Sequence, residues 1–141
     1  MSFAEKFYRS RDGLQLYYRD YAGDASKAPV LCLHGLTRNS RDFAALAEHI
    51  APTRRVIVPD QRGRGRSQYD THWLNYHPGT YVDDMWTLLA ELSVPRLVVV
   101  GTSLGGLLAM RARRRCFVCT GSRATVVTLP SSPSASRRRG G

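Results

Sequence analysis

A serine, Ser103, lies between two glycines, Gly101 and Gly105, in the pattern G-x-S-x-G. The pattern directly follows one apolar run at 97–100 and precedes another at 107–110, which predicts a tight turn between a strand and a helix. A serine at the apex of such a turn crowds the backbone on both sides, and glycine relieves that crowding. The start of the helix would also stabilise negative charge. The spacing therefore predicts a nucleophilic serine rather than a glycine-rich turn that only closes a strand.

A serine nucleophile needs two further groups. Its hydroxyl reacts poorly until a histidine takes the proton and a carboxylate holds that histidine in the right tautomer. No Asp, Glu or His follows Ser103 in the sequence. A rearranged set would have to come from the two histidines and three aspartates His72, His77, Asp70, Asp83 and Asp84. Without a base and an orienting acid, we expect activity to be about 10⁴- to 10⁶-fold lower than that of an enzyme with the complete set.

Five strands are predicted before the serine. The segments 3–9 and 14–21 flank a turn-forming R-D-G tripeptide and predict an antiparallel hairpin. Short, largely apolar segments at 30–33, 55–60 and 97–100 predict strands buried on both faces of a sheet.

Two helices are predicted between these strands. The first can be capped by Ser40 or Asp42 and is stopped by Pro52. The second covers 81–92, with the aspartates at 83 and 84 in its first turn, where the helix dipole favours anions. Strands that alternate with helices imply crossover connections, so the predicted class is α/β with a mostly parallel sheet and an antiparallel N-terminal hairpin.

Three motifs in this order resemble those of the α/β-hydrolase fold enzymes that use a serine. The strand at 30–33 ends in His34-Gly35, the segment 60–67 has the form D-x-R-G-x-G-x-S beginning at Asp60, and G-x-S-x-G follows. The resemblance covers about residues 3–112 and implies a truncated α/β-hydrolase fold, since these enzymes continue for about twice this length.

The resemblance also implies site roles. The backbone N–H groups of Leu36 and Leu104 would form the oxyanion hole, and His34 would shape that loop rather than act as the base. The implied reaction is hydrolysis of an ester, lactone or related acyl bond in a small-molecule substrate through Ser103. The family needs no metal or organic cofactor, and its acid and histidine follow the serine.

The arginine-rich loop at 61–67 permits a second interpretation. Gly63 and Gly65 could suggest a phosphate cradle, but the GK[ST] ending of a P-loop is absent. We expect the three arginines of this loop to face solvent or to orient it.

The net charge of +10 is concentrated after the serine. Residues 1–103 carry a net charge of +2, whereas residues 104–141 contain eight arginines and no acid. The domain is therefore predicted to end near residue 110, followed by a disordered tail at 111–141. Within the tail, only 124–129 could form a strand, and its valines could pair with the apolar edge of the strand at 97–100.

Two explanations of this tail remain open from the sequence. Its composition is what a frameshift in a GC-rich coding sequence would produce. A basic tail that binds nucleic acid or an acidic partner is the less favoured alternative. In the second case the chain would be a non-catalytic fragment or binding module.

The cysteine content and the hydropathy of the sequence indicate where in the cell the protein is located. The odd set Cys32, Cys116 and Cys119 does not indicate a disulfide framework, and the C-x-x-C pair has no second pair or following histidine to complete a zinc site. No apolar run approaches the length of a membrane helix, and no secretory leader is evident. These features predict a cytoplasmic protein without a membrane partner. They do not predict its oligomeric state.

Overall fold

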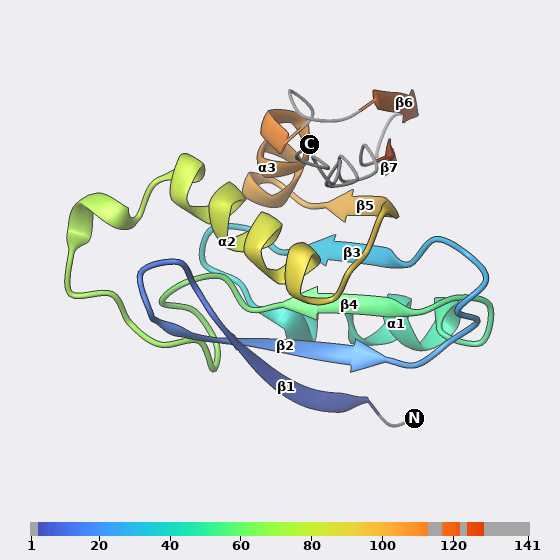
Figure 1. Cartoon of the computed structure of the whole chain (residues 1–141), viewed down its shortest axis with the longest axis horizontal. Helices are drawn as coiled ribbons and strands as arrows, with labels where there is room; N and C mark the ends of the chain where they lie inside the picture. Colours follow the sequence, from blue (N-terminus) through green and yellow to red (C-terminus); the bar gives the residue numbers. More distant parts are fainter. Residues whose placement is uncertain (1–2, 113–116, 122–123, 129–141) are drawn as a thin grey trace, which may run out of the picture.

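The computed structural model describes residues 3–112, 117–121 and 124–128, which form one sheet with helices on both faces (Figure 1). The described strands have the spatial order β1-β2-β4-β3-β5-β7-β6. Their bounds are β1 Ala4–Arg9, β2 Gln15–Tyr21, β3 Val30–Leu33, β4 Val56–Pro59, β5 Arg96–Gly101, β6 Phe117–Gly121 and β7 Ala124–Thr128.

The parallel part of the sheet consists of β4, β3 and β5. The pairs β1–β2, β2–β4, β5–β7 and β6–β7 are antiparallel. The α/β class and the N-terminal hairpin are thus confirmed, and parallel pairing is confined to β3, β4 and β5, the strands that are joined by helical crossovers.

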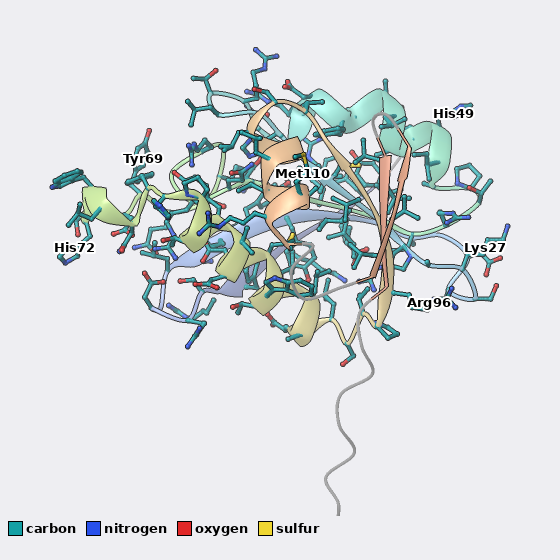
Figure 2. The ribbon with its side chains drawn as sticks, turned by 90° about the horizontal axis from the view of Figure 1, so that it is seen from above. Lys27, His49, Tyr69, His72, Arg96 and Met110 are labelled. Carbon is teal, nitrogen blue, oxygen red and sulfur yellow. The ribbon has the colours of Figure 1, made fainter. Side chains whose placement is uncertain are left out.

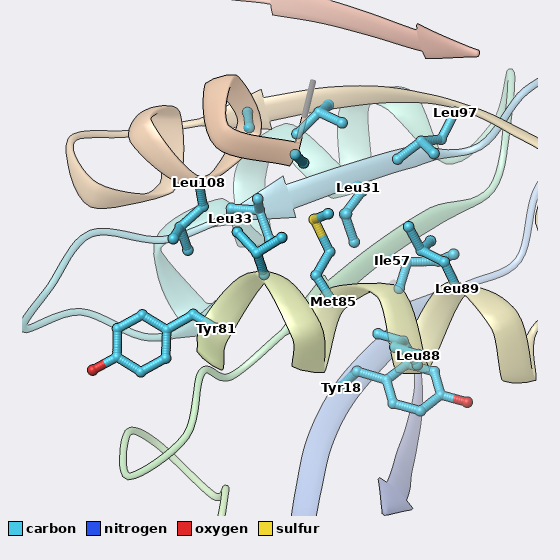
Figure 3. Packing of buried hydrophobic residues seen from close by; sticks show 14 of the residues in the cluster. Tyr18, Leu31, Leu33, Ile57, Tyr81, Met85, Leu88, Leu89, Leu97 and Leu108 are labelled. Atoms are coloured by element: carbon cyan, nitrogen blue, oxygen red, sulfur yellow. The ribbon is translucent and has the colours of Figure 1, made fainter. Parts of the chain in front are cut away.

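Helices α2 (Pro78–Glu91) and α3 (Leu104–Ala112) cover one face of the sheet, and α1 (Ala44–Ile50) covers the other (Figure 1). Every residue of β3 and β4 is buried, because alternate side chains enter the two opposite cores. Figure 3 shows the larger core, in which strand residues meet the inner side of α2 and α3. Its labelled members include Tyr18, Leu31, Leu33, Ile57, Leu97, Met85, Leu88, Leu89 and Leu108.

The starts of both predicted helices differ from the sequence interpretation. A 3₁₀ turn over Ser40–Phe43 leads into α1, and its cap is Asn39, whose side chain accepts from the Arg41 N–H. Helix α2 begins at Pro78, with His77 as its cap. The aspartates at 83 and 84 therefore lie beyond the first turn, and the predicted contact with the positive end of the helix dipole is wrong. Apolar spacing could not locate the start of α2, since its first turn is not apolar.

Asp84 instead pairs with Arg62, which is buried in an ion cluster. The Arg62 guanidinium donates to Asp84 at 2.8 and 3.1 Å, to Asp12 at 2.6 and 2.8 Å and to Asp70 at 2.7 Å. Its side chain is 1% exposed, so for this arginine the expectation of a solvent-facing side chain is wrong. The cluster ties the β1–β2 turn and the loop after β4 to α2.

These contacts shift several pKa values. Burial alone would lower the pKa of Arg62, but its carboxylate partners outweigh burial and raise it. Burial raises the pKa of Asp84, and Arg62 offsets only part of that effect. The hydrogen bonds from Arg62 lower the pKa of Asp12, and the pKa of Asp70 is lowered first by the His72 N–H and then by side-chain partners. Arg62 is therefore the common counter-charge of the three carboxylates.

After α3, the described segments are the strands β6 and β7. The predicted strand at 124–129 is present as β7, which pairs with β5 so that Val126 lies opposite Val98 and residue 127 opposite Leu97. Strand β6 was not predicted from the sequence. The rest of 113–141, with Cys116, lies outside the described residues. No helix within the described part of the chain is long and apolar enough to cross a membrane.

Replacing Arg62 tests the ion cluster. Arg62→Met leaves Asp84 buried without its counter-charge, so we expect unfolding in urea at pH 7 to require about 3 kcal/mol less free energy. The lowered pKa values of Asp12 and Asp70 stabilise the native chain above about pH 4, and this contribution is lost as the pH falls. Unpaired Asp84 also destabilises the variant only while ionised. The penalty should therefore be greatest at neutral pH and shrink towards pH 4.

Arg38→Gln is the matched control, because Arg38 holds Asp42 on the surface with two similar hydrogen bonds at 2.7 and 2.8 Å. Its unfolding midpoint should stay unchanged. Equal effects of the two substitutions, or a penalty from Arg62→Met that does not vary with pH, would contradict the role given to the buried cluster.

Candidate active site

Ser103 occupies the turn between β5 and α3 with a left-handed backbone. Its φ is +53°, a conformation that costs a non-glycine residue about 1–2 kcal/mol. The turn is closed by the Gly105 N–H, which donates to the Thr102 carbonyl at 2.9 Å, and by the Leu107 N–H, which donates to the Ser103 carbonyl at 3.2 Å. The serine is exposed at the carboxyl edge of the parallel strands.

The two glycines of the motif allow the helix to approach the sheet. A Cβ on Gly105 would overlap the carbonyl of Leu33 on β3, and a Cβ on Gly101 would overlap the backbone of Gly105. Both overlaps are with backbone, which cannot move aside cheaply. The strand, the turn and the helix can therefore close around Ser103 only with these two glycines.

The loop after β3 lies beside the serine. The Thr102 N–H donates to the Leu33 carbonyl at 3.1 Å, and a Cβ built on Gly35 would lie 3.7 Å from the Cβ of Ser103. Within the described residues, neither the Leu36 N–H nor the Leu104 N–H donates a hydrogen bond. Two unused donors thus flank Ser103 in the chain segments that meet at this edge.

His34 is buried beneath this loop, and both of its ring nitrogens are engaged. Nδ1 lies 2.7 Å from the Gly35 carbonyl oxygen, and Nε2 accepts from the Gln61 N–H at 2.9 Å. Because Nε2 is an acceptor, the proton resides on Nδ1, and burial lowers the pKa of His34, which favours this neutral form. The carbonyl and the following N–H point to opposite sides of a trans peptide, so fixing the Gly35 carbonyl also fixes the Leu36 N–H.

Arg64 holds the other side of the same loop. Its Nε–H donates to the Leu36 carbonyl at 2.9 Å and its Nη1–H to the Arg62 carbonyl at 2.9 Å, while the guanidinium lies 4.8 Å from the ring centre of Tyr81. Arg64 therefore orients the loop, one of the two alternatives expected for these arginines. The sequence interpretation did not identify this contact, or those of Gln61, although both residues lie in the motif at 60–67.

Asp60 is a buried backbone anchor. One carboxylate oxygen accepts from the Ser40 N–H at 2.6 Å and the other from the Arg66 N–H at 2.9 Å. The Ser67 hydroxyl donates to the Asp60 carbonyl at 2.6 Å. Both carboxylate oxygens thus organise backbone, and Asp60 links the motif loop to the turn that leads into α1.

The residues considered for a rearranged triad do not gather at the serine. Asp70 and Asp84 bind Arg62, and His77 accepts from the Gly79 N–H at 3.0 Å as the cap of α2. His72 lies on the outer loop, away from the sheet (Figure 2). Among the described residues, the Ser103 hydroxyl has no side-chain hydrogen-bond partner.

Metal-binding groups are also not assembled in the described part of the chain, where no three His, Cys, Asp or Glu side chains form a potential ligand set. Cys32 is a buried thiol whose pKa burial raises to about 12. Cys119 lies in β6, of which only the backbone is described. The C-x-x-C pair therefore stays a sequence observation.

Comparison with known proteins identifies the fold family. The family model described as alpha/beta hydrolase fold matches residues 28–114. The 3-hydroxybutyrate-oligomer hydrolase of Cupriavidus necator is 40% identical over 96 residues, which cover 68% of this chain and 33% of that protein. A proline iminopeptidase of Lactobacillus crispatus is 32% identical over 101 residues, covering 70% of this chain and 34% of that protein.

Solved structures of other proteins have a fold similar to that of this chain. An alpha/beta hydrolase from Novosphingobium aromaticivorans has a TM-score of 0.78 and 47% identity, covering 79% of this chain and 39% of that one. The thioesterase domain from the curacin biosynthetic pathway has a TM-score of 0.73 and 28% identity, covering 80% of this chain and 42% of that one. Epoxide hydrolases of Vigna radiata, at 18% identity, share the fold.

The chain spans about a third of the length of these curated relatives. The family match nevertheless covers more than half of the chain and includes the loop after β3, the motif at 60–67 and the serine turn. This chain belongs to the alpha/beta hydrolase fold family.

Proposed function

We propose that Ser103 is the nucleophile of a serine hydrolase that acts on an ester, lactone or related acyl substrate. The observation that carries this proposal is the left-handed, exposed Ser103 at a glycine-closed strand-to-helix turn, with Gly35 beside it. Strained backbone conformations cluster at active sites, where the surrounding structure holds them in place.

In the proposed reaction, Ser103 Oγ attacks the acyl carbon and the carbonyl oxygen becomes an oxyanion. The Leu36 and Leu104 N–H groups would donate to that oxyanion, with Leu36 oriented by His34 and Arg64. Collapse of the tetrahedral intermediate breaks the bond to the leaving alcohol or thiol, which departs with a proton and leaves an acyl-enzyme. Water then attacks the acyl carbon, which releases the carboxylic acid and restores the Ser103 hydroxyl. None of these steps needs a metal or an organic cofactor.

Removal of the serine proton needs a base that residues 3–112 do not offer. His34 is committed to two backbone contacts, and no other described histidine bonds to Ser103. In this family the acid and the histidine follow the serine in the chain. The complete reaction therefore requires groups beyond those of the described site, and we expect this chain alone to be a very slow enzyme.

The names of two similar proteins support an acyl compound as the substrate. One is a 3-hydroxybutyrate-oligomer hydrolase and another a thioesterase domain, and both names denote cleavage of an acyl bond. Serine at this position argues against epoxide opening, because family members with that chemistry use an aspartate there. We propose a small-molecule acyl substrate for the whole protein and a cytoplasmic location.

A non-catalytic role is the second candidate, either as a fragment or as a binding module. It is favoured by the lack of any acid or histidine after Ser103 and by the eight arginines there. In that case the basic segment would contact an acidic partner or nucleic acid, and binding should weaken steeply with salt.

Labelling with a fluorophosphonate distinguishes these candidates. The reagent needs a nucleophilic serine with oxyanion donors, so we expect slow labelling, about 10⁴- to 10⁶-fold below that of complete serine hydrolases. Added imidazole should accelerate labelling by supplying the missing base. Mass spectrometry of the labelled chain should place the adduct on Ser103.

Ser93 provides the matched control, because it is exposed and also has a positive φ, at +51°. Ser103→Ala should abolish the imidazole-dependent labelling, and Ser93→Ala should leave its rate unchanged. Labelling that persists in Ser103→Ala, or no labelling at any imidazole concentration, would favour the non-catalytic candidate.

Strain at Ser103 is tested by stability. Ser103→Gly should stabilise the fold by about 1 kcal/mol relative to Ser103→Ala, because glycine adopts a positive φ without the Cβ conflict. Chemical denaturation of the two variants measures the difference. The same Gly and Ala pair at Ser93 calibrates the method, since its φ is similar. An alanine variant at 103 as stable as the glycine variant would mean that the turn is not strained.

A further inference from the structure

A concave site lies beside the motif loop at 60–67. It is a cavity of about 230 Å³ bounded mainly by Tyr17, Arg19, Asn39, Arg41, Asp60 and Arg66. Leu16 and Tyr18 of β2 enter the core under α2, so the alternating Tyr17 and Arg19 belong to the other face of the sheet. Ser103 does not line this cavity.

We propose that this cavity, which we term the arginine pocket, binds a phosphate-type oxyanion, either inorganic phosphate or the phosphoryl group of a small phosphomonoester. This inference is independent of the proposed acyl hydrolysis.

The charges around the arginine pocket are not balanced. Among the described residues, Arg19 and Arg41 make no ion pair, and Arg66 pairs only with Glu5. Asp60 contributes one negative charge to the lining, but its carboxylate oxygens accept backbone N–H groups and bond to no described arginine side chain. The three guanidinium groups of the lining are thus opposed by two carboxylates, Asp60 and the Glu5 partner of Arg66, which leaves one net positive charge.

Arg19 also has N–H donors that lack a close acceptor within the described segments, which supports an anion-binding role for the pocket. Its Nε is buried and has no described acceptor, and its Nη1 reaches only the Tyr21 hydroxyl at a long 3.4 Å. By contrast, Arg55, which precedes β4, donates to Asp20 of β2 at 2.8 and 2.9 Å. A buried N–H without an acceptor is costly, and an anion that accepts from the Arg19 Nε–H would relieve that cost.

The side chains of the arginine pocket are also held in place before any ligand arrives. The Arg19 guanidinium lies 4.2 Å from the ring centre of Phe3, and that of Arg66 lies 5.0 Å from the ring centre of Tyr17. The Arg41 Nε–H donates to Asn39 Oδ1 at 3.3 Å. Planar guanidinium groups bind phosphate oxygens with paired hydrogen bonds, and groups already ordered lose less entropy on binding.

The size of the pocket sets the ligand class. Pockets for drug-sized ligands have volumes of about 300–1,000 Å³, so this smaller cavity suits phosphate or a compact phosphomonoester. A doubly charged phosphate also matches two unpaired guanidinium groups better than a single carboxylate would.

Calorimetric titration of the full chain tests the proposal, at constant ionic strength set with chloride. One series uses inorganic phosphate and a second uses glycerol 3-phosphate, so that the tighter ligand identifies the source of the oxyanion. We expect saturable binding of at least one of them. Arg19→Gln and Arg41→Gln should each weaken it by at least about tenfold, since each removes a charge-assisted contact.

Arg96→Gln is the matched control, because it removes one positive charge from the start of β5, whereas Asp60 of the pocket follows the end of β4, at the opposite edge of the parallel strands. Its affinity should equal that of the unmodified chain. Arg41 is exposed, so its substitution keeps the test valid if Arg19→Gln fails to fold. No saturable binding of either ligand, or equal weakening by Arg96→Gln and Arg41→Gln, would overturn the proposal.

Discussion

The close approach of α3 to β3 is the constraint on which the site depends. The backbone of Gly105 lies against the Leu33 carbonyl with no room for a Cβ, and Gly101 is packed as closely against Gly105. This contact forces the chain to reverse within two residues and leaves Ser103 at φ +53°. It also brings the serine to the end of β3, where the loop with Gly35 begins. The strain at one residue is thus a consequence of packing the helix on the sheet.

The loops around the serine are held by polar contacts rather than by apolar packing. His34 reaches from beneath the β3 loop to Gln61, and Arg64 reaches back from the motif loop to the Leu36 carbonyl. Arg62 then anchors the motif loop to α2 through Asp84. Because these contacts are directional, they can fix the orientation of single peptide groups, which apolar contacts cannot do. The apolar cores on the two sheet faces supply the rigid base for this network.

Sequence patterns predicted the elements whose signals are local. Continuous apolar runs located β3, β4 and β5, and the G-x-S-x-G spacing predicted the turn at Ser103. The start of α2 and the cap at Asn39 were missed, because polar residues there gave no periodic signal. The partners of Arg62 were missed for a different reason. Asp12, Asp70 and Asp84 lie 50, 8 and 22 residues from Arg62 in the sequence, and no local sequence rule predicts that these side chains meet.

The central claim is that Ser103 and the Leu36 and Leu104 N–H groups act on the same acyl centre. The most direct test is a crystal structure of the chain after prolonged treatment with a fluorophosphonate and imidazole. The account predicts an adduct on Ser103 whose phosphonyl oxygen lies about 2.7–3.1 Å from both backbone nitrogens. An adduct whose oxygen points to solvent, with neither nitrogen within hydrogen-bond distance, would contradict it.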